Sequence, residues 1–174
     1  MSLELDPRTS ALVLIDLQNG IVANATAPHA SRDVVTRGAR LARAFREQGA
    51  LVVLVRVVFD AQLRDRLFSP ADQQAAVTPP APEWYSFVPE VQPEPDDVVV
   101  NKKQWGAFYG TDLDLQLRRR GVRTIVIGGI ATNFGVESTA RDGWERGYHL
   151  VFVEDAMAGY SEAMHRFPVG FVFP

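Results

Sequence analysis

The chain has 174 residues, of which 47% are hydrophobic and 22% are charged, with a net charge of −3 and no cysteine. This length and composition are typical of one globular domain with a sizeable core, and they exclude wholesale disorder. The mildly acidic balance disfavours a nucleic-acid-binding protein, because such proteins usually carry a basic excess. The lack of cysteine excludes disulfides, a thiolate nucleophile and iron–sulfur clusters, and it fits a reducing compartment.

No apolar run approaches the ~18 residues that a membrane-spanning helix requires. Near the N-terminus, Glu4 and Asp6 stand where a secretory leader would carry basic residues. We therefore expect a cytoplasmic protein without a membrane partner.

Short apolar runs alternate with segments of helical periodicity along the chain. The pattern predicts strands at 11–15, 51–59, 98–101, 124–128 and 150–153. It predicts helices at 34–48, 112–120, 136–146 and about 161–166, before an apolar tail at 169–173. Strands that alternate with helices favour right-handed crossovers, so we expect a parallel sheet covered on both faces.

A proline-rich excursion interrupts this alternation at about 69–97. It holds seven of the eleven prolines, together with Trp84, Tyr85 and Phe87. Rigid prolines among aromatic residues indicate an ordered segment that covers a site or forms a subunit contact. No flexible linker divides the rest, so we expect 1–174 to form a single domain.

The candidate chemistry lies after the predicted strands, because ligands bind at the carboxyl ends of the strands in an open parallel sheet. Asp16 follows the first strand, and Lys102 and Lys103 follow the third. A lysine lowers the pKa of a neighbouring carboxyl while burial raises it, so such a pair suits proton transfer. The alternative for Asp16 is a carboxylate that only accepts loop hydrogen bonds. Because successive side chains of a strand point to opposite faces, only one of the two lysines points inward, and the sequence leaves open which one it is.

The turn at 130–137 leads from a predicted strand into a helix. Its backbone amides can hold a substrate oxygen with the help of the helix dipole, although Gly135 can also serve close packing alone. Trp105, Phe108 and Tyr109 either line a pocket or belong to the core, and core is the commoner role of such aromatics.

Other chemistries lack support in the sequence. The three histidines, His29, His149 and His165, are scattered without metal-ligand spacing. The glycine-rich nucleotide motifs and the Gly-x-Ser-x-Gly elbow are absent. We therefore expect neither a metal nor a cofactor.

Three segments do resemble a known family. They are ALVLIDLQNGI (11–21), NKKQWGAFYGTDLDLQLRRRG (101–121) and GGIATNFGVESTARDGWERGY (128–148), which VEDA (153–156) follows. In this order they resemble the isochorismatase-like hydrolases, also called the cysteine hydrolase superfamily. The resemblance implies a three-layer αβα, Rossmann-like fold with a mainly parallel sheet of about six strands. It also implies assembly into homodimers or larger homo-oligomers.

The resemblance also suggests roles for individual residues. The family's catalytic Asp falls on Asp16, its Lys on Lys102 rather than Lys103, and its nucleophilic Cys on Gly135. A non-proline cis peptide would precede the turn, between residues 130 and 131. The substrate contacts that we expect around these groups are Gln18, Phe108, Ile130, Ala131, Thr132, Asn133 and Phe134.

Gly135 is the decisive departure, because glycine cannot attack a substrate and the thiol amidase route needs a thiolate. Isochorismatases also carry glycine there and hydrolyse a vinyl ether after protonation by an Asp. They have Tyr-Ala-His where this chain has 131–133, and a Gln where it has 57–58. The Asp-x-His of metal-dependent nicotinamidases is also missing.

We therefore expect a hydrolase that acts on a small, anionic molecule without a covalent thiol intermediate. The alternative is a catalytically silent family member that serves as a small-molecule binding or scaffold protein. The retained pair of Asp16 and Lys102 favours the enzyme.

Overall fold

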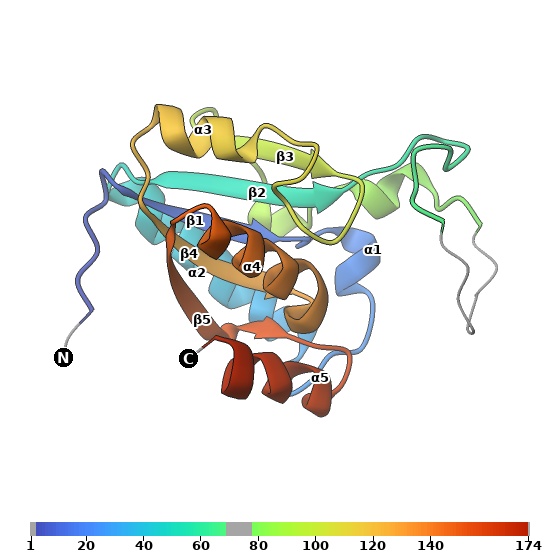
Figure 1. Ribbon diagram of the computed structural model, residues 1–174. Coiled ribbons are helices and arrows are strands. Elements are labelled where there is room, and N and C mark those ends of the chain that lie inside the picture. Colours follow the sequence, from blue (N-terminus) through green and yellow to red (C-terminus); the bar gives the residue numbers. More distant parts are fainter. Residues whose placement is uncertain (1–2, 69–77, 174) are drawn as a thin grey trace.

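The computed structural model describes residues 3–68 and 78–173, so part of the proline-rich excursion, 69–77, lies outside the described residues. Five parallel strands form one sheet in the order β3-β2-β1-β4-β5 (Figure 1). The strands are β1 (Ser10–Ile15), β2 (Leu51–Val57), β3 (Val98–Lys102), β4 (Thr124–Ile130) and β5 (His149–Ala158). The described residues thus form five strands where the resemblance implied about six.

In the described residues, five α-helices and four 3-10 or π-helical turns accompany the strands. The helices are α1 (Asn19–Val22), α2 (Ser31–Glu47), α3 (Leu113–Arg119), α4 (Glu137–Glu145) and α5 (Glu162–Phe167). Two 3-10 turns lie at Pro82–Tyr85 and Pro89–Val91, and two π-helical turns at Thr132–Val136 and Pro168–Val172. Within 3–68 and 78–173, no helix has both the length and the apolarity to cross a membrane.

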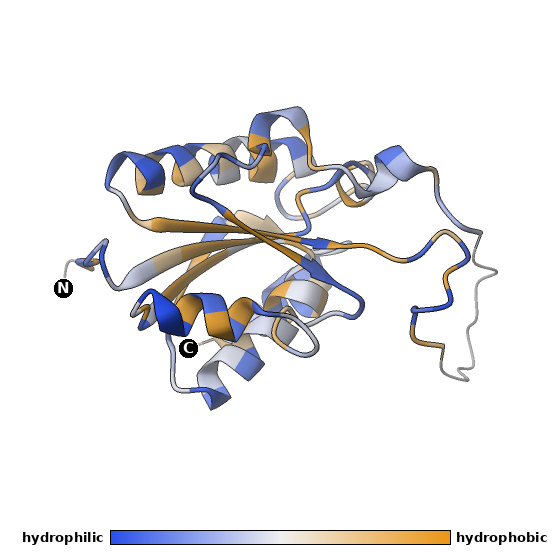
Figure 2. Ribbon diagram, turned by 90° about the horizontal axis from the view of Figure 1, so that it is seen from above, coloured by the Kyte–Doolittle hydropathy of each residue, from blue (hydrophilic) through white to orange (hydrophobic). Residues whose placement is uncertain are grey.

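The helices cover both faces of the sheet, which gives the expected three-layer αβα arrangement. On one face, Leu113 and Leu117 of α3 join the core cluster of Val13 and Ile15. On the other face, α2 and the segment 82–91 pack against the alternate residues of β1. Figure 2 shows the apolar strands between two helical layers whose hydrophilic sides face outward. Because β1 is central and buried on both faces, its sequence is a continuous apolar run.

The order of the strands places a switch point beside β1. The chain adds β2 and β3 on one side of β1 and then returns to add β4 and β5 on the other (Figure 1). Ile15, the last residue of β1, therefore pairs with Val55 of β2 and with Gly129 of β4. A Cβ atom on Gly129 would lie 2.1 Å from the carbonyl oxygen of Ile15, so only glycine fits here. The loops after β1 and β4 meet at this point, where open sheets bind ligands.

Candidate active site

A cavity of about 890 Å³ opens at the carboxyl ends of the strands, next to the switch point. Its lining includes the ends of β1, β3 and β4 and the loops around 57–67, 78–84 and 104–106. Trp84 and Pro80 are part of it, so the described part of the proline-rich excursion does border the site.

Asp16 and Lys102 form a buried ion pair in the wall of this cavity. Nζ of Lys102 donates to Oδ2 of Asp16 at 2.7 Å and to the carbonyl oxygen of Gln104 at 3.1 Å. The two residues are only 5% and 2% exposed. Lys103 does not contact Asp16 and instead pairs with Asp65 through a side chain that is 41% exposed. The strand alternation thus directs Lys102 inward.

Burial and Lys102 have opposite effects on the pKa of the Asp16 carboxyl. Burial raises its pKa to about 6, although the charge and the hydrogen bond of Lys102 act in the opposite direction. Oδ1 of Asp16 is buried and has no hydrogen-bond partner among the described residues. One oxygen is therefore held by Lys102, while the other has no hydrogen-bond partner among the described residues. Tyr160 lines the same cavity, and burial and the charge of Asp16 raise the pKa of its phenol, which stays neutral.

The π-helical turn Thr132–Val136 contributes Phe134 and Gly135 to the lining of the cavity. The peptide bond between Ile130 and Ala131 is cis, as the resemblance implied. A Cβ atom built on Gly135 would lie 3.2 Å from Oδ2 of Asp16, so the α-carbon of this glycine faces the carboxylate directly. Ile130, Ala131, Phe134 and Gly135 all line the cavity.

Four of the expected substrate contacts do not line the cavity. Phe108 is 3% exposed and stacks on Tyr148 in the core, because it points toward the face that α3 and α4 cover. Gln18 is fully buried, and its side chain bonds the backbone N–H and C=O of Val57. The hydroxyl of Thr132 bonds His165. For Gln18, Phe108 and Thr132 the structure shows structural contacts in place of the expected substrate contacts.

The fourth of these residues, Asn133, is part of the turn but outside the lining of the cavity. Its Oδ1 is buried without a partner among the described residues.

Other lining residues were missed by the sequence reasoning. Arg66 brings positive charge to the cavity, and Phe59 and Tyr160 bring aromatic surface. They come from loops without periodicity or from the segment after β5, so no spacing marks them. The position after the fifth strand was the one signal that could have pointed to Tyr160.

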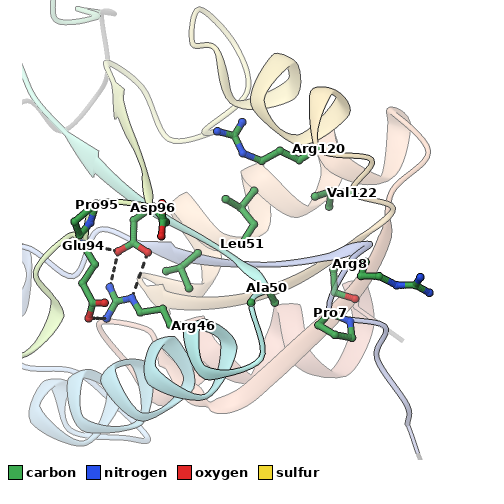
Figure 3. A pocket seen from close by; sticks show the side chains of 14 residues that line it. Pro7, Arg8, Arg46, Ala50, Leu51, Glu94, Pro95, Asp96, Arg120 and Val122 are labelled. Atoms are coloured by element: carbon green, nitrogen blue, oxygen red, sulfur yellow. Dashed lines mark hydrogen bonds and ion pairs between the residues drawn. The ribbon is translucent and has the colours of Figure 1, made fainter.

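A second cavity, of about 640 Å³, lies at the opposite edge of the sheet. Arg46 crosses it and is engaged by Glu94 at 2.8 Å and by Asp97 (Figure 3). This edge carries the amino ends of the strands, where parallel sheets do not bind their ligands. Because the guanidinium of Arg46 is paired with two carboxylates, and because this is the amino edge of the sheet, we assign this cavity no function.

A parallel sheet with a buried acid at its switch point, open to a cavity, is the arrangement of an α/β enzyme for small molecules. The sequence model of the Isochorismatase domain matches residues 10–172. The chain therefore belongs to the isochorismatase family, whose members are hydrolases.

Similar proteins agree with this assignment. The uncharacterized isochorismatase family protein YecD of Escherichia coli O157:H7 is 45% identical over 172 residues, which are 99% of this chain and 92% of that protein. An isochorismatase family protein of Burkholderia thailandensis has a solved structure that matches with a TM-score of 0.91 and 47% identity, over 98% of this chain and 89% of that chain. The ureidoacrylate amidohydrolase RutB of Methylobacterium radiotolerans is 33% identical, over 93% of this chain and 72% of that protein.

Proposed function

We propose that this protein hydrolyses a small, anionic vinyl ether, with Asp16 as general acid and without a covalent thiol intermediate. The observation that carries the proposal is the buried carboxyl of Asp16, which lines the cavity, has a pKa of about 6 and is paired with Lys102. At pH 7 a group with this pKa is about one-tenth protonated, whereas an ordinary Asp is protonated to only about 0.1%. Burial thus keeps a useful fraction of the acid form at neutral pH.

The reaction begins with transfer of the proton from the Asp16 carboxyl to the terminal methylene carbon of the vinyl ether. The electron pair of the carbon–carbon double bond forms the new C–H bond, and the ether oxygen stabilises the resulting oxocarbenium ion. The ammonium of Lys102 stabilises the carboxylate that Asp16 becomes.

Water then adds to the cationic carbon and gives its proton to the Asp16 carboxylate. The hemiketal that results breaks its bond to the former ether oxygen, which leaves as an alcohol, and the rest becomes a ketone. Overall, one vinyl ether and one water give one alcohol and one ketone, and the carboxyl of Asp16 is again protonated. No step needs a nucleophile at position 135.

The charge of the cavity supports an anionic substrate. Arg66 lines it, and Nη1 of Arg66 is buried without a partner among the described residues, whereas Lys103 is already paired with Asp65. A substrate carboxylate would satisfy this donor, since guanidinium groups bind carboxylates well. Phe59, Trp105 and Phe134 give the cavity apolar walls for a carbon skeleton.

The test is an assay with isochorismate, an anionic vinyl ether, in which the pyruvate released is measured by a coupled enzyme. We expect turnover by the wild type and a loss of about 10²- to 10⁴-fold in Asp16→Asn, the usual contribution of a general acid. Asp33→Asn, an exposed carboxylate on α2, is the matched control and should keep full activity. Turnover that survives Asp16→Asn would reject the mechanism. Ligand binding without turnover across a panel of vinyl ethers and amides would favour a binding protein.

A further inference from the structure

Two of the three histidines, which are far apart in the sequence, meet at one carboxylate outside the active-site cavity. Nε2 of His29 lies 3.0 Å from Oε1 of Glu154, and Nε2 of His165 lies 2.8 Å from the same oxygen. The three candidate ligand atoms all lie within 4.8 Å of one another. His29 precedes α2, Glu154 belongs to β5, and His165 belongs to α5, so the fold joins three separate segments here.

We propose that His29, Glu154 and His165 form a binding site for a zinc-like divalent transition-metal ion. Two imidazole nitrogens and one carboxylate oxygen are a donor set that Zn²⁺ uses, with a fourth position left for water. Zn²⁺ holds such ligands at about 2.0–2.2 Å, which places neighbouring ligand atoms roughly 3.3 Å apart in a tetrahedron. The observed separations of 2.8 and 3.0 Å from Oε1 need only a slight opening to admit the ion.

The remaining nitrogen of His165 supports a metal-binding role. Nδ1 lies 2.8 Å from Oγ1 of Thr132, and both residues are buried, at 2% and 0% exposure. Histidines that bind metals usually donate their other N–H to an oxygen, which fixes the ring and directs the free nitrogen to the ion. Without an ion, Nε2–H of His165 donates to Glu154. When an ion binds, the proton would move to Nδ1, which would then donate to Oγ1 of Thr132 and free the lone pair of Nε2 for the ion.

The cluster is accessible to solvent, and it contains an acidic side chain, Glu154, that can bind a cation. The side chains of Glu154 and His29 are 48% and 23% exposed, which leaves a path from solvent. Glu154 supplies the carboxylate oxygen of the proposed ligand set. The neighbouring Asp155 is paired with Arg37 at 3.3 Å.

The site would position the active-site turn rather than take part in the chemistry. None of the three ligands lines the cavity that contains Asp16. Thr132, which bonds His165, begins the π-helical turn that carries Phe134 and Gly135 into that cavity. A bound ion would hold β5, α5 and this turn together. The inference does not depend on the proposed reaction.

The test uses the full chain after dialysis against a chelator, titrated with Zn²⁺ in a calorimeter and with Co²⁺ as a spectroscopic probe. We expect one Zn²⁺ per chain and visible Co²⁺ bands typical of tetrahedral coordination. His29→Ala and Glu154→Gln should each weaken Zn²⁺ binding at least about tenfold, and Thr132→Val should do so by about 10- to 100-fold, as outer partners do. Circular dichroism shows whether each variant is folded.

The chain supplies its own control in His149, the third histidine, which is exposed on β5 and away from the cluster. His149→Ala should bind Zn²⁺ with unchanged affinity and stoichiometry, and so should Asp16→Asn. The proposal is overturned if the wild type shows no saturable binding, or if His149→Ala loses as much affinity as His29→Ala. Because no substrate is present, failure here is distinct from failure of the proposed hydrolysis.

Discussion

Gly135 and Ile15 stand so close that a Cβ atom on Gly135 would lie 2.7 Å from Cγ2 of Ile15. Ile15 is fully buried in the core at the end of the central strand, and its methyl group branches directly from Cβ. It therefore has little freedom to move aside. The geometry restricts position 135 to glycine as long as Ile15 is retained.

Substituting Gly135 by alanine should therefore destabilise the protein by about 1–3 kcal/mol, the usual cost of overpacking. In an Ile15→Ala background the added methyl group has room, so the same substitution should cost less. Urea denaturation of the four proteins in this double-mutant cycle measures the difference. Gly170→Ala is the control, because a Cβ atom there would have no neighbour within 4 Å. An equal cost of Gly135→Ala in both backgrounds would contradict this explanation.

The pH dependence of hydrolysis should reveal the acid role of Asp16. Its pKa is about 6, and the reactive form is the protonated one. Therefore kcat/KM for isochorismate should be level below about pH 5 and fall about tenfold per pH unit well above pH 6. Initial rates measured between about pH 5 and pH 8.5 show this falling limb of the pH profile of kcat/KM. A rate that rises with pH through 6 would instead show a general base.

Removing the charge of Lys102 should shift the pH at which kcat/KM falls. Lys102→Met keeps the length of the side chain and removes the charge and hydrogen bond that lower the pKa of Asp16. The falling limb of kcat/KM should therefore move to higher pH, by roughly one to three units. Lys103→Met is the matched control, since Lys103 also lines the cavity but pairs with Asp65 instead. If the limb keeps its position in Lys102→Met, this lysine does not set the protonation of Asp16.

Much of the fold was predictable because the local patterns agree with it. Strands buried on both faces gave continuous apolar runs, and the ends of elements differ from the prediction by only a few residues in most cases. β5 is the main exception: it continues to Ala158, well beyond the predicted 150–153. Its register against β4 shifts between Ile127 and Gly129, so the polar Glu154 and Asp155 sit in an irregular stretch. A bulge of this kind breaks the alternation that marks a strand.

The sequence predicts only those residues of the candidate site that lie in recognisable short motifs at the ends of strands. Asp16 follows β1 and Lys102 ends β3, so both lie at the carboxyl edge of the sheet, where the lysine side chain reaches the carboxylate. The histidine cluster left no signal, because Glu154 is 125 residues from His29 in the sequence. Only the packing of α2 and α5 against β5 brings these ligands into contact.

The aromatic residues Trp105 and Phe108 offer the sharpest test of which side chains bind substrate. The sequence places them three residues apart without separating their roles. In the structure, Trp105 is 64% exposed and lines the cavity, whereas Phe108 is 3% exposed and stacks on Tyr148 at 5.9 Å. Trp105→Ala should therefore raise KM, by about tenfold for each 1.4 kcal/mol of lost contact, and leave the free energy of unfolding within about 0.5 kcal/mol.

Phe108→Leu should show the opposite behaviour. A smaller side chain in the tightly packed core should lower the free energy of unfolding by about 1–3 kcal/mol while KM stays unchanged. Steady-state kinetics and urea denaturation on the same preparations separate the two effects. If folded Phe108→Leu raises KM as much as Trp105→Ala does, Phe108 contacts the substrate, and the cavity extends beyond the walls assigned to it.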